Sequence, residues 1–395
     1  MSENLWTRTP LIESSSLSTA AGCRIFLKLD NYQPSGSFKY RGISHLMQSA
    51  ILSRDPQSLT HLHYYCSSGG NAGIACATAA RSMGYPATVV IPLATSTFMV
   101  NKIRSLGAFV HQVGASWADA DRYLKENLLS KDPNGFYVPP FDNPVIWEGA
   151  SSMFEEVYEQ MEDVDVDEEG IDGVVCSVGG GSLLTGIMTA IERNFTPSLR
   201  RPQPPWVLAV ETRGAESLNA SLKGGKHITL PKINSIATSL GVVRVASRAY
   251  ELAQRSNVTS LVLSDAEAAM GSVRFAEDEN VLVEVSCGVG LAAVYNGELR
   301  KAMGSDMSDE DWREMKIVVA VCGGSDVTPE LLEKYRQRYS AEAPGVMRRP
   351  TDEAVSFDNF AGRRCSQSLG ILGFDVSLSE KDESLYSVRP FEIAC

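Results

Sequence analysis

Short apolar runs alternate with longer amphipathic stretches through most of the chain. The short runs have the length and residue types of strands, and the amphipathic stretches are typical of helices. Strands are therefore predicted over residues 24–29, 61–66, 87–91, 108–113, 173–178, 206–210, 261–263, 281–285 and 317–322. Helices are predicted over residues 71–83, 96–106, 117–129, 148–161 and 183–194.

The order strand, helix, strand predicts an α/β fold. Its sheets are expected to be open, mostly parallel and twisted, with helices on both faces. The 395 residues allow about two to three domains of ~150 residues each. Breaks are predicted near residues 141–144 and 240–241. Ligands in such folds bind at the carboxyl ends of strands, and the Gly- and Ser-rich turns of this chain follow its predicted strands.

Composition narrows the class of protein. Hydrophobic residues make up 44% of the chain and charged residues 21%, which is typical of a globular protein. A formal net charge of -12 without a Lys/Arg run argues against a nucleic-acid partner. No apolar run reaches the ~20 residues that span a bilayer, and the first residues do not resemble a signal peptide. The eight cysteines show no CxxC spacing and are expected to be reduced thiols, so we predict a cytoplasmic protein.

The first candidate for chemistry is Lys39, within the segment 34–42 (PSGSFKYRG) after the predicted strand 24–29. Turn residues let the backbone approach a ligand, and the helix expected to start here has an electropositive N-terminus. An amine beside positive partial charge loses its proton more easily, and a neutral lysine forms Schiff bases with aldehydes. The alternative is an ordinary solvated lysine.

The second candidate is the turn that contains Ser68, Gly69 and Asn71, between the strand ending at Cys66 and a small-residue helix. Its hydroxyls and backbone N–H groups suit an anion such as a substrate carboxylate, and Asn71 can donate to a phenolate or carbonyl oxygen. The alternative is a capped helix that packs tightly through small residues.

The third candidate is the run Gly179, Gly180, Gly181, Ser182 and Leu183, again between a strand and a helix. Consecutive N–H groups and the helix dipole predict a cradle for one phosphate. The dinucleotide pattern GxGxxG and the P-loop both fail on spacing. A purely structural glycine-rich turn is the alternative.

The fourth candidate is Cys322, at the end of the strand 317–322 and before Gly323 and Gly324. A thiol there can face a heteroatom of a ligand, but unlike a carboxylate it would not keep a ring nitrogen protonated. A buried cysteine that acts as a small hydrophobic residue is the alternative.

A lysine for a Schiff base, an anion loop, a one-phosphate cradle and a polar strand end together describe a site for pyridoxal phosphate. The chain resembles the fold-type II pyridoxal-phosphate enzymes, and among them the L-serine/L-threonine dehydratases, especially the short liver-type members. The resemblance runs from Thr9 to about Tyr335. Its motifs are residues 27–30, 33–42, 66–73, 139–142, 146–149, 179–181, 239–241, 284–288 and 322–325.

This resemblance implies roles for the candidate residues. Lys39 would hold the cofactor as a Schiff base, and Phe38 would pack beside the ring. Asn71 would donate to the phenolic oxygen, and Cys322 would face the ring nitrogen. Gly179, Gly180, Gly181, Ser182 and Leu183 would bind the phosphate, and Ser68, Gly69 and Asn71 would bind the substrate carboxylate.

The implied reaction is an α,β-elimination that converts L-serine to pyruvate, or L-threonine to 2-oxobutanoate, with release of ammonia. Lys39 would remove the α-proton. Gly69 argues against racemisation, because similar racemases carry a serine hydroxyl at this position. Two alternatives stay open: a related β-elimination or β-replacement on a specialised amino acid, and a cofactor-binding protein without catalysis.

The resemblance also implies a homodimer and a monovalent cation, K⁺, near the phosphate loop. The matching cation ligands are Glu211, Ala215, Ser217, Leu240 and Val242. A large cofactor-binding domain is predicted over residues 1–42 and 145–340, and a small substrate-side domain over 43–144. Residues 341–395 are predicted to be a C-terminal extension.

Overall fold

The computed structural model describes residues 4–164, 170–198 and 201–349, all of which belong to one compact unit, residues 1–352. The predicted C-terminal extension lies mostly outside the described residues. Its first part forms α16 (Pro344–Met347). This segment is held by the buried Arg274, which donates to the backbone oxygens of Val346 at 2.7 Å and Arg348 at 2.8 Å.

A six-stranded sheet forms the larger core. Its strand order is β1-β2-β10-β7-β8-β9, and every pairing is parallel except that of β1 with β2. The register of the pair β10–β2 runs from Lys316 opposite Arg24 to Val321 opposite Leu29. In chain order these strands are β1 (Leu11–Glu13), β2 (Arg24–Leu29), β7 (Gly173–Ser177), β8 (Trp206–Thr212), β9 (Val258–Leu263) and β10 (Lys316–Val321).

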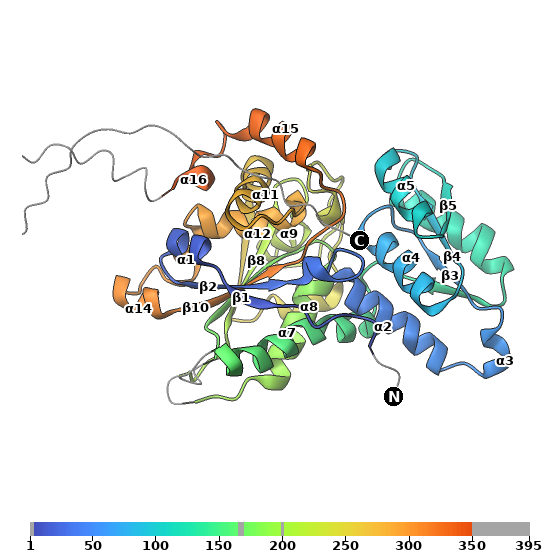
Figure 1. Cartoon of the computed structure of the whole chain (residues 1–395), viewed down its shortest axis with the longest axis horizontal. Helices are drawn as coiled ribbons and strands as arrows, with labels where there is room; N and C mark the ends of the chain where they lie inside the picture. The colour runs from blue at the N-terminus through green and yellow to red at the C-terminus, as the bar shows by residue number, and fades with distance from the viewer. Residues whose placement is uncertain (1–3, 165–169, 199–200, 350–395) are drawn as a thin grey trace, which may run out of the picture. The chain divides into compact units, whose positions relative to one another are not determined.

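Helices cover both faces of this sheet, so its central strands are buried throughout. The helices α7 (Pro144–Val164) and α8 (Ser182–Asn194) lie on one face, and α11 (Asp265–Glu279) and α12 (Val285–Tyr295) on the other (Figure 1). Shorter helices surround them: α1 (Ser15–Ala21), α9 (Ser217–Lys223), α10 (Ser247–Leu252), α13 (Glu298–Met303), α14 (Asp309–Glu314) and α15 (Pro329–Tyr339).

A four-stranded parallel sheet forms a second core. Its order is β5-β4-β3-β6, and the strands are β3 (His63–Cys66), β4 (Ala87–Ile91), β5 (Phe109–Gln112) and β6 (Gly135–Val138). Neighbouring side chains point to opposite faces, so Tyr64 packs with α2 (Lys39–Leu52) and α4 (Asn71–Met83), and Tyr65 packs with α6 (Trp117–Tyr123). The other elements of this part are α3 (Pro56–Leu59), α5 (Thr97–Ser105), a π-helix (Leu124–Leu128) and a 3-10 helix (Leu129–Lys131).

The α/β prediction is confirmed, and helix α4 has the predicted bounds. The predicted strand 281–285 is wrong, because Glu284 caps α12 and Val285 is its first residue. A short apolar run does not distinguish a strand from the approach to a buried helix. The predicted helix 117–129 changes to a π-helix after Tyr123, and β6 was not predicted. The domain boundaries stay a prediction.

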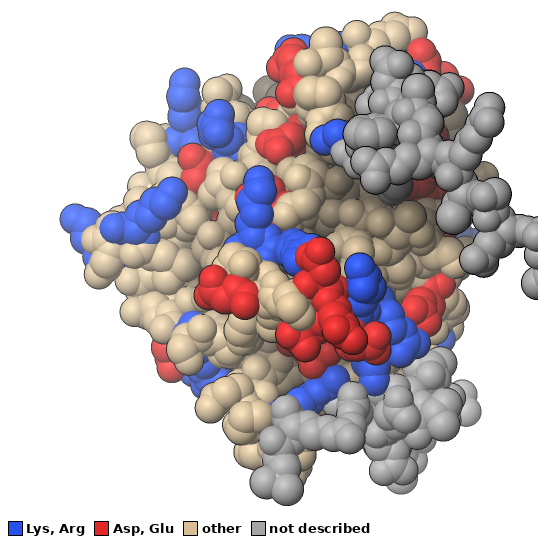
Figure 2. All heavy atoms as spheres, turned by 90° about the vertical axis from the view of Figure 1, so that its left-hand side faces the viewer, with Lys and Arg blue, Asp and Glu red and all other residues tan. Residues whose placement is uncertain are grey.

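On the face of the molecule in Figure 2, acidic and basic side chains lie next to one another. Ion pairs of this kind join α11 to α15, through Arg336 and Glu277, and α13 to α14, through Arg300 and Asp309. Within the described ranges, no helix combines the length and apolar character needed to cross a bilayer.

Candidate active site

Lys39 is the first residue of α2 and lies against two distant parts of the chain. Its Nζ donates to the backbone oxygen of Pro140 at 2.9 Å and to Ser182 Oγ at 3.2 Å. The same Nζ lies 5.2 Å from the ring centre of Phe38 and 5.8 Å from that of Phe141. Desolvation lowers the pKa of Lys39 to about 8, against the opposing influence of the Cys322 and Cys66 thiols. Near neutral pH this amine is therefore neutral more often than that of an ordinary, solvated lysine.

This pKa makes a direct prediction. The folded protein should show acylation of Lys39 that rises with pH around a midpoint of about 8. In urea the midpoint should move to the ordinary value for lysine, roughly 10.4, because unfolding restores hydration. Mass spectrometry of the Lys39 peptide after brief treatment with an amine-reactive reagent measures both midpoints. Equal midpoints in the folded and unfolded protein would contradict desolvation as the cause.

The segment Gly179–Ser182 lies between β7 and α8, and its three glycines are packed too closely for side chains. A Cβ on Gly179 would lie 2.8 Å from Leu240 Cα, and a Cβ on Gly180 would overlap the ring of Phe141. Gly181 precedes α8 with φ 91°, in the left-handed region that favours glycine. The first N–H groups of α8, including those of Ser182 and Leu183, have no carbonyl partner within the helix. This end of α8 is suited to a phosphate group.

We expect Gly180→Ala to weaken binding of a phosphate-bearing cofactor at least tenfold, because the methyl group would displace either the loop or Phe141. The control is Gly290→Ala in α12, where a Cβ would meet its nearest neighbour at an ordinary 3.6 Å. Titration of the cofactor-free protein with pyridoxal phosphate measures the effect. Equal affinities of the two variants would show that the close packing of Gly180 does not matter for binding.

The segment Ser67–Asn71 connects β3 to α4. Ser67 is buried and donates to Asp121 Oδ1 at 2.6 Å, which anchors the start of this turn to α6. Ser68 and Gly69 are partly exposed, and Ser68 Oγ accepts from the N–H of Gly70 at 3.4 Å. A Cβ on Gly69 would lie 2.8 Å from Thr95 Oγ1, so the threonine side chain fills the space beside this glycine.

Asn71 joins the smaller sheet to loops of the larger one. Its Nδ2 donates to Glu284 Oε1 at 2.6 Å and to Ser239 Oγ at 3.2 Å, and its Oδ1 accepts from the N–H of Ser325 at 2.9 Å. Ser239 lies next to Leu240, which packs on Gly179. The turn at residues 67–71 and the segment 179–182 therefore meet through residues 239–240.

Cys322 follows β10 and is buried near Lys39. Its Sγ lies 3.4 Å from Ser177 Oγ, and its backbone oxygen accepts from the N–H of Phe38 at 3.1 Å. The adjoining Gly323 pairs with Ser37 in an isolated bridge. The loop before α2 and the loop after β10 are thus held together, and all four segments identified in the sequence come together here.

Three of the residues predicted to bind a cation, Glu211, Ala215 and Ser217, lie at the end of β8, in the turn that follows it and at the start of α9. Glu211 is fully buried, and its carboxylate accepts from the N–H groups of Leu218 at 2.9 Å and Asn219 at 2.7 Å. Burial raises the pKa of Glu211 to about 8. Ser217 Oγ is buried and has no hydrogen-bond partner in the described part of the chain. Ala215 and Leu240 are buried, and Val242 is half-buried after the 3-10 helix Thr238–Leu240.

Several residues at this site were not singled out from the sequence. Phe141, Ser239, Glu284 and Ser325 lie within segments that carry the resemblance, but no role was assigned to them. For Glu284 and the two serines, the sequence signal that could have indicated a role is a polar residue inside an otherwise apolar or glycine-rich run. Thr185 adds a buried Oγ1 without a hydrogen-bond partner among the described residues, one turn into α8.

Comparison with known proteins supports this arrangement. The family model "Pyridoxal-phosphate dependent enzyme" matches residues 3–323. The chain is 38% identical over 335 residues to the catabolic L-serine/threonine dehydratase of Saccharomyces cerevisiae, covering 84% of this chain and 90% of that protein. It is 41% identical over 325 residues to the L-serine dehydratase/L-threonine deaminase of Bos taurus, covering 82% and 93%.

The chain is also similar to a solved structure. The fungal L-serine ammonia-lyase from Rhizomucor miehei is similar with a TM-score of 0.75 and 32% identity, covering 85% of this chain and 100% of that one. The family match, residues 3–323, extends over both sheets and includes Lys39, Asn71, Gly179–Ser182 and Cys322. The chain therefore belongs to the family of pyridoxal-phosphate dependent enzymes.

Proposed function

We propose that this protein is a pyridoxal-phosphate-dependent ammonia-lyase that acts on L-serine or L-threonine. The substrate loses water across Cα and Cβ, and hydrolysis of the resulting enamine yields ammonia with pyruvate or 2-oxobutanoate. The observation that carries the proposal is the Lys39 amine, 3.2 Å from Ser182 Oγ at the start of α8. The names of the relatives in yeast and cattle support the same reaction.

The residues present fit pyridoxal phosphate. The start of α8 offers N–H groups that have no carbonyl partner within the helix. The Thr185 hydroxyl oxygen is buried and has no hydrogen-bond partner among the described residues. Phe38 and Phe141 flank the Lys39 amine with aromatic surface. We assign the phosphate to Gly179, Gly180, Gly181, Ser182 and Leu183, and the Schiff base to Lys39. When bound, the cofactor withdraws electrons from the substrate Cα and so makes its proton acidic.

Lys39 is the group that we assign to the proton transfer. With cofactor and substrate bound, the Lys39 Nζ would accept the α-proton, and its pKa of about 8 suits a base that works near neutral pH. The backbone oxygen of Pro140 accepts from this amine, which orients its lone pair. Cys322 lies near enough to affect the pKa of Lys39, and we assign its thiol to the ring nitrogen.

The substrate carboxylate is assigned to Ser68, Gly69 and Asn71. The hydrogen bond from Ser67 to Asp121 anchors this turn to α6. Residue 69 is a glycine, so no hydroxyl projects from it toward the substrate. The Thr95 side chain, including Oγ1, occupies the space beside it. The lack of a side chain at residue 69 supports elimination over racemisation.

We also propose a monovalent cation, K⁺, at Glu211, Ser217 and the carbonyl groups of Ala215, Leu240 and Val242. Burial disfavours the ionised form of Glu211, and a cation beside the carboxylate would offset that cost. Among the described residues, the Ser217 hydroxyl oxygen has no hydrogen-bond partner. The melting temperature should be higher in KCl than in LiCl at equal ionic strength, and Glu211→Gln should remove the difference. An equal melting temperature in both salts would overturn this assignment.

A homodimer and a cytoplasmic location are part of the same proposal. Light scattering at several concentrations tests the dimer, and a monomer at all of them would refute it. Microscopy of a tagged chain in its host cell tests the location.

The decisive experiment is a panel of amino acids incubated with the cofactor-loaded protein, with assays for 2-oxoacid and ammonia. We expect equal amounts of both products from L-serine, L-threonine or both. Product from a different amino acid alone would favour the specialised elimination or replacement. A cofactor absorbance band that no amino acid alters would favour a protein without catalysis.

A further inference from the structure

Glu284 is a buried carboxyl group for which the proposed reaction has no task. It directly precedes α12 and is only 6% exposed. Gly324, with φ 125°, packs against it so closely that any side chain at position 324 would overlap the carboxyl group. Burial raises the pKa of Glu284 to about 7. A carboxyl group enclosed in this way is expected to have a structural or functional partner.

That partner is Asn71. The distance of 2.6 Å from Asn71 Nδ2 to Glu284 Oε1 is short, as expected of a hydrogen bond to a charged acceptor. The other carboxyl oxygen accepts from the N–H of Asp326 at 3.4 Å. Glu284 therefore joins the start of α4 to the loop after β10, two segments far apart in the sequence.

The Asn71 amide makes hydrogen bonds that differ in length and partner. Its oxygen can only face the N–H of Ser325, which fixes the direction of the amide. One N–H is held by Glu284, and the second makes the longer bond of 3.2 Å to Ser239 Oγ. Ser239 also makes a hydrogen bond to the Glu284 carboxyl group. The N–H that faces Ser239 makes the longer of the two bonds, so it is the one that we assign to a ligand.

We propose that Glu284 is a positioning residue for Asn71. By holding one N–H of the amide, it directs the other toward the oxygen of a bound ligand, and it links the two sheets through Asn71 and Ser325. The role at the ligand rests on the proposed function, because it assumes that Asn71 contacts the cofactor or the substrate.

The charged groups around Glu284 are compatible with this role. Lys102 of α5 donates to the backbone oxygen of Ser325 at 3.3 Å and attracts the Glu284 carboxylate. Asp326 opposes its ionisation, and Tyr335 of α15 lies within electrostatic range. The hydrogen bonds from Asn71, Ser239 and Asp326 favour the ionised form. The cluster draws on α4, α5, α12, α15 and the loop after β10.

Amide hydrogen exchange of the cofactor-free protein tests the link between the sheets. We expect Glu284→Ala to speed exchange of the Ser325 N–H at least tenfold. The substitution removes the bond from Asn71 Nδ2 to Glu284, so the amide can rotate and its oxygen no longer accepts steadily from the Ser325 N–H. Glu284→Gln keeps an acceptor and should give a smaller increase. The control is Glu267→Ala in α11, whose Oε1 likewise accepts from an asparagine, Asn296, at 3.0 Å. It should leave Ser325 unchanged.

A double-mutant cycle tests the effect on the ligand. We expect Glu284→Ala and Asn71→Ala each to weaken binding of pyridoxal phosphate roughly tenfold to a hundredfold. The double variant should bind no more weakly than Asn71→Ala alone, because Glu284 acts through Asn71. The ratio of the visible to the near-ultraviolet absorbance band of the bound cofactor should change in both single variants and be restored in part by Glu284→Gln.

The outcomes separate the two proposals. Unchanged exchange at Ser325 in both Glu284 variants would overturn the positioning role, whatever the substrate is. Independent, multiplying losses of affinity in the double variant would also overturn it. Failure of every amino acid in the substrate panel would refute the proposed reaction, but it would leave the exchange and binding results as evidence on Glu284.

Discussion

Replacement of Lys39 by alanine is expected to abolish covalent attachment of pyridoxal phosphate and to lower the rate of elimination by at least about 10²–10⁴-fold, the usual contribution of a general base. Without this amine, no other group described near Ser182 can form the Schiff base. The fold should be retained, because Lys39 forms no ion pair with the residues that the structure describes, and its burial disfavours its charge. Borohydride treatment followed by peptide mass spectrometry measures attachment, and assays of 2-oxoacid and ammonia measure the rate.

Lys301→Ala is the matched control for this experiment. The Lys301 side chain is 71% exposed and pairs with Glu298 on the surface. Its removal should change neither attachment nor rate. Borohydride-stable cofactor on the Lys39→Ala protein at wild-type yield would show that another lysine holds it.

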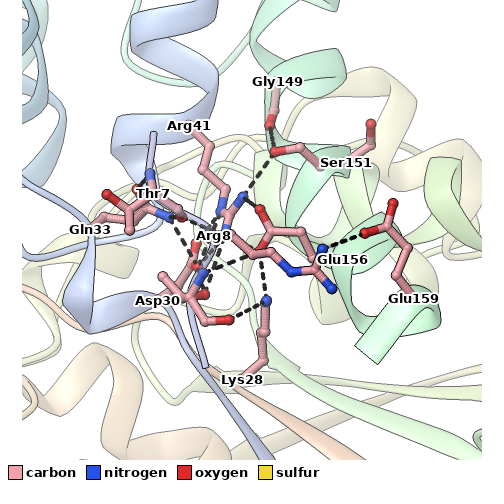
Figure 3. Close-up of polar contacts among 12 residues, drawn as sticks. Thr7, Arg8, Lys28, Asp30, Gln33, Arg41, Gly149, Ser151, Glu156 and Glu159 are labelled. Atoms are coloured by element: carbon pink, nitrogen blue, oxygen red, sulfur yellow. Dashed lines mark hydrogen bonds and ion pairs between the residues drawn. The ribbon is translucent and has the colours of Figure 1, made fainter. Parts of the chain in front are cut away.

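The second large effect is expected from Glu156→Gln, with a loss of about 3–5 kcal/mol in the free energy of unfolding. Glu156 Oε2 accepts from Lys28 Nζ at 2.6 Å, and Oε1 accepts from Arg41 Nη1 at 2.7 Å (Figure 3). The side chains of Lys28 and Arg41 are fully buried. After the substitution these two cations would share the single carboxylate of Asp30, which bonds Arg41 Nε at 2.8 Å.

Glu159→Gln, one turn further along α7, is the control. Glu159 pairs with Arg8 at 2.9 Å, but the two side chains are 63% and 53% exposed, so the loss should be below about 1 kcal/mol. Urea denaturation followed by circular dichroism measures both variants. Equal losses would mean that burial does not set the strength of these pairs. Because Arg41 lies two residues after Lys39 in α2, Glu156→Gln should also disturb the position of the Lys39 backbone.

Local patterns predicted most of the elements. Residues 71–83 combine small and apolar residues with a glycine turn at each end, and the helix has these bounds. Residues 281–285 were mistaken for a strand, because the burial of Val283 and Val285 comes from packing at the start of a helix. The strand β6 (Gly135–Val138) was missed: it begins with a glycine and is followed directly by two prolines, residues that usually mark turns.

At the site, too, features that depend on neighbouring residues could be predicted, and contacts between distant residues could not. Gly179–Ser182 and the turn around Asn71 could be found because turns at strand ends have recognisable residues. Glu284 and Ser239 could not be assigned roles, because their bonds to Asn71 span 213 and 168 residues. Likewise, no sequence pattern identified Arg41 as buried, but its side chain is fully buried against Asp30 and Glu156.

The sequence by itself determined that the chain alternates strands and helices, and that a lysine, an asparagine and a glycine run each lie at the start of a helix. These properties depend on neighbouring residues, through backbone conformation and the periodicity of apolar positions. Only the tertiary structure decided which of these helix starts meet, which carboxyl groups are buried, and that the pKa values of Lys39 and Glu284 lie near 8 and 7. Desolvation and hydrogen bonding between distant segments arise only when the chain is packed, and no local pattern records them.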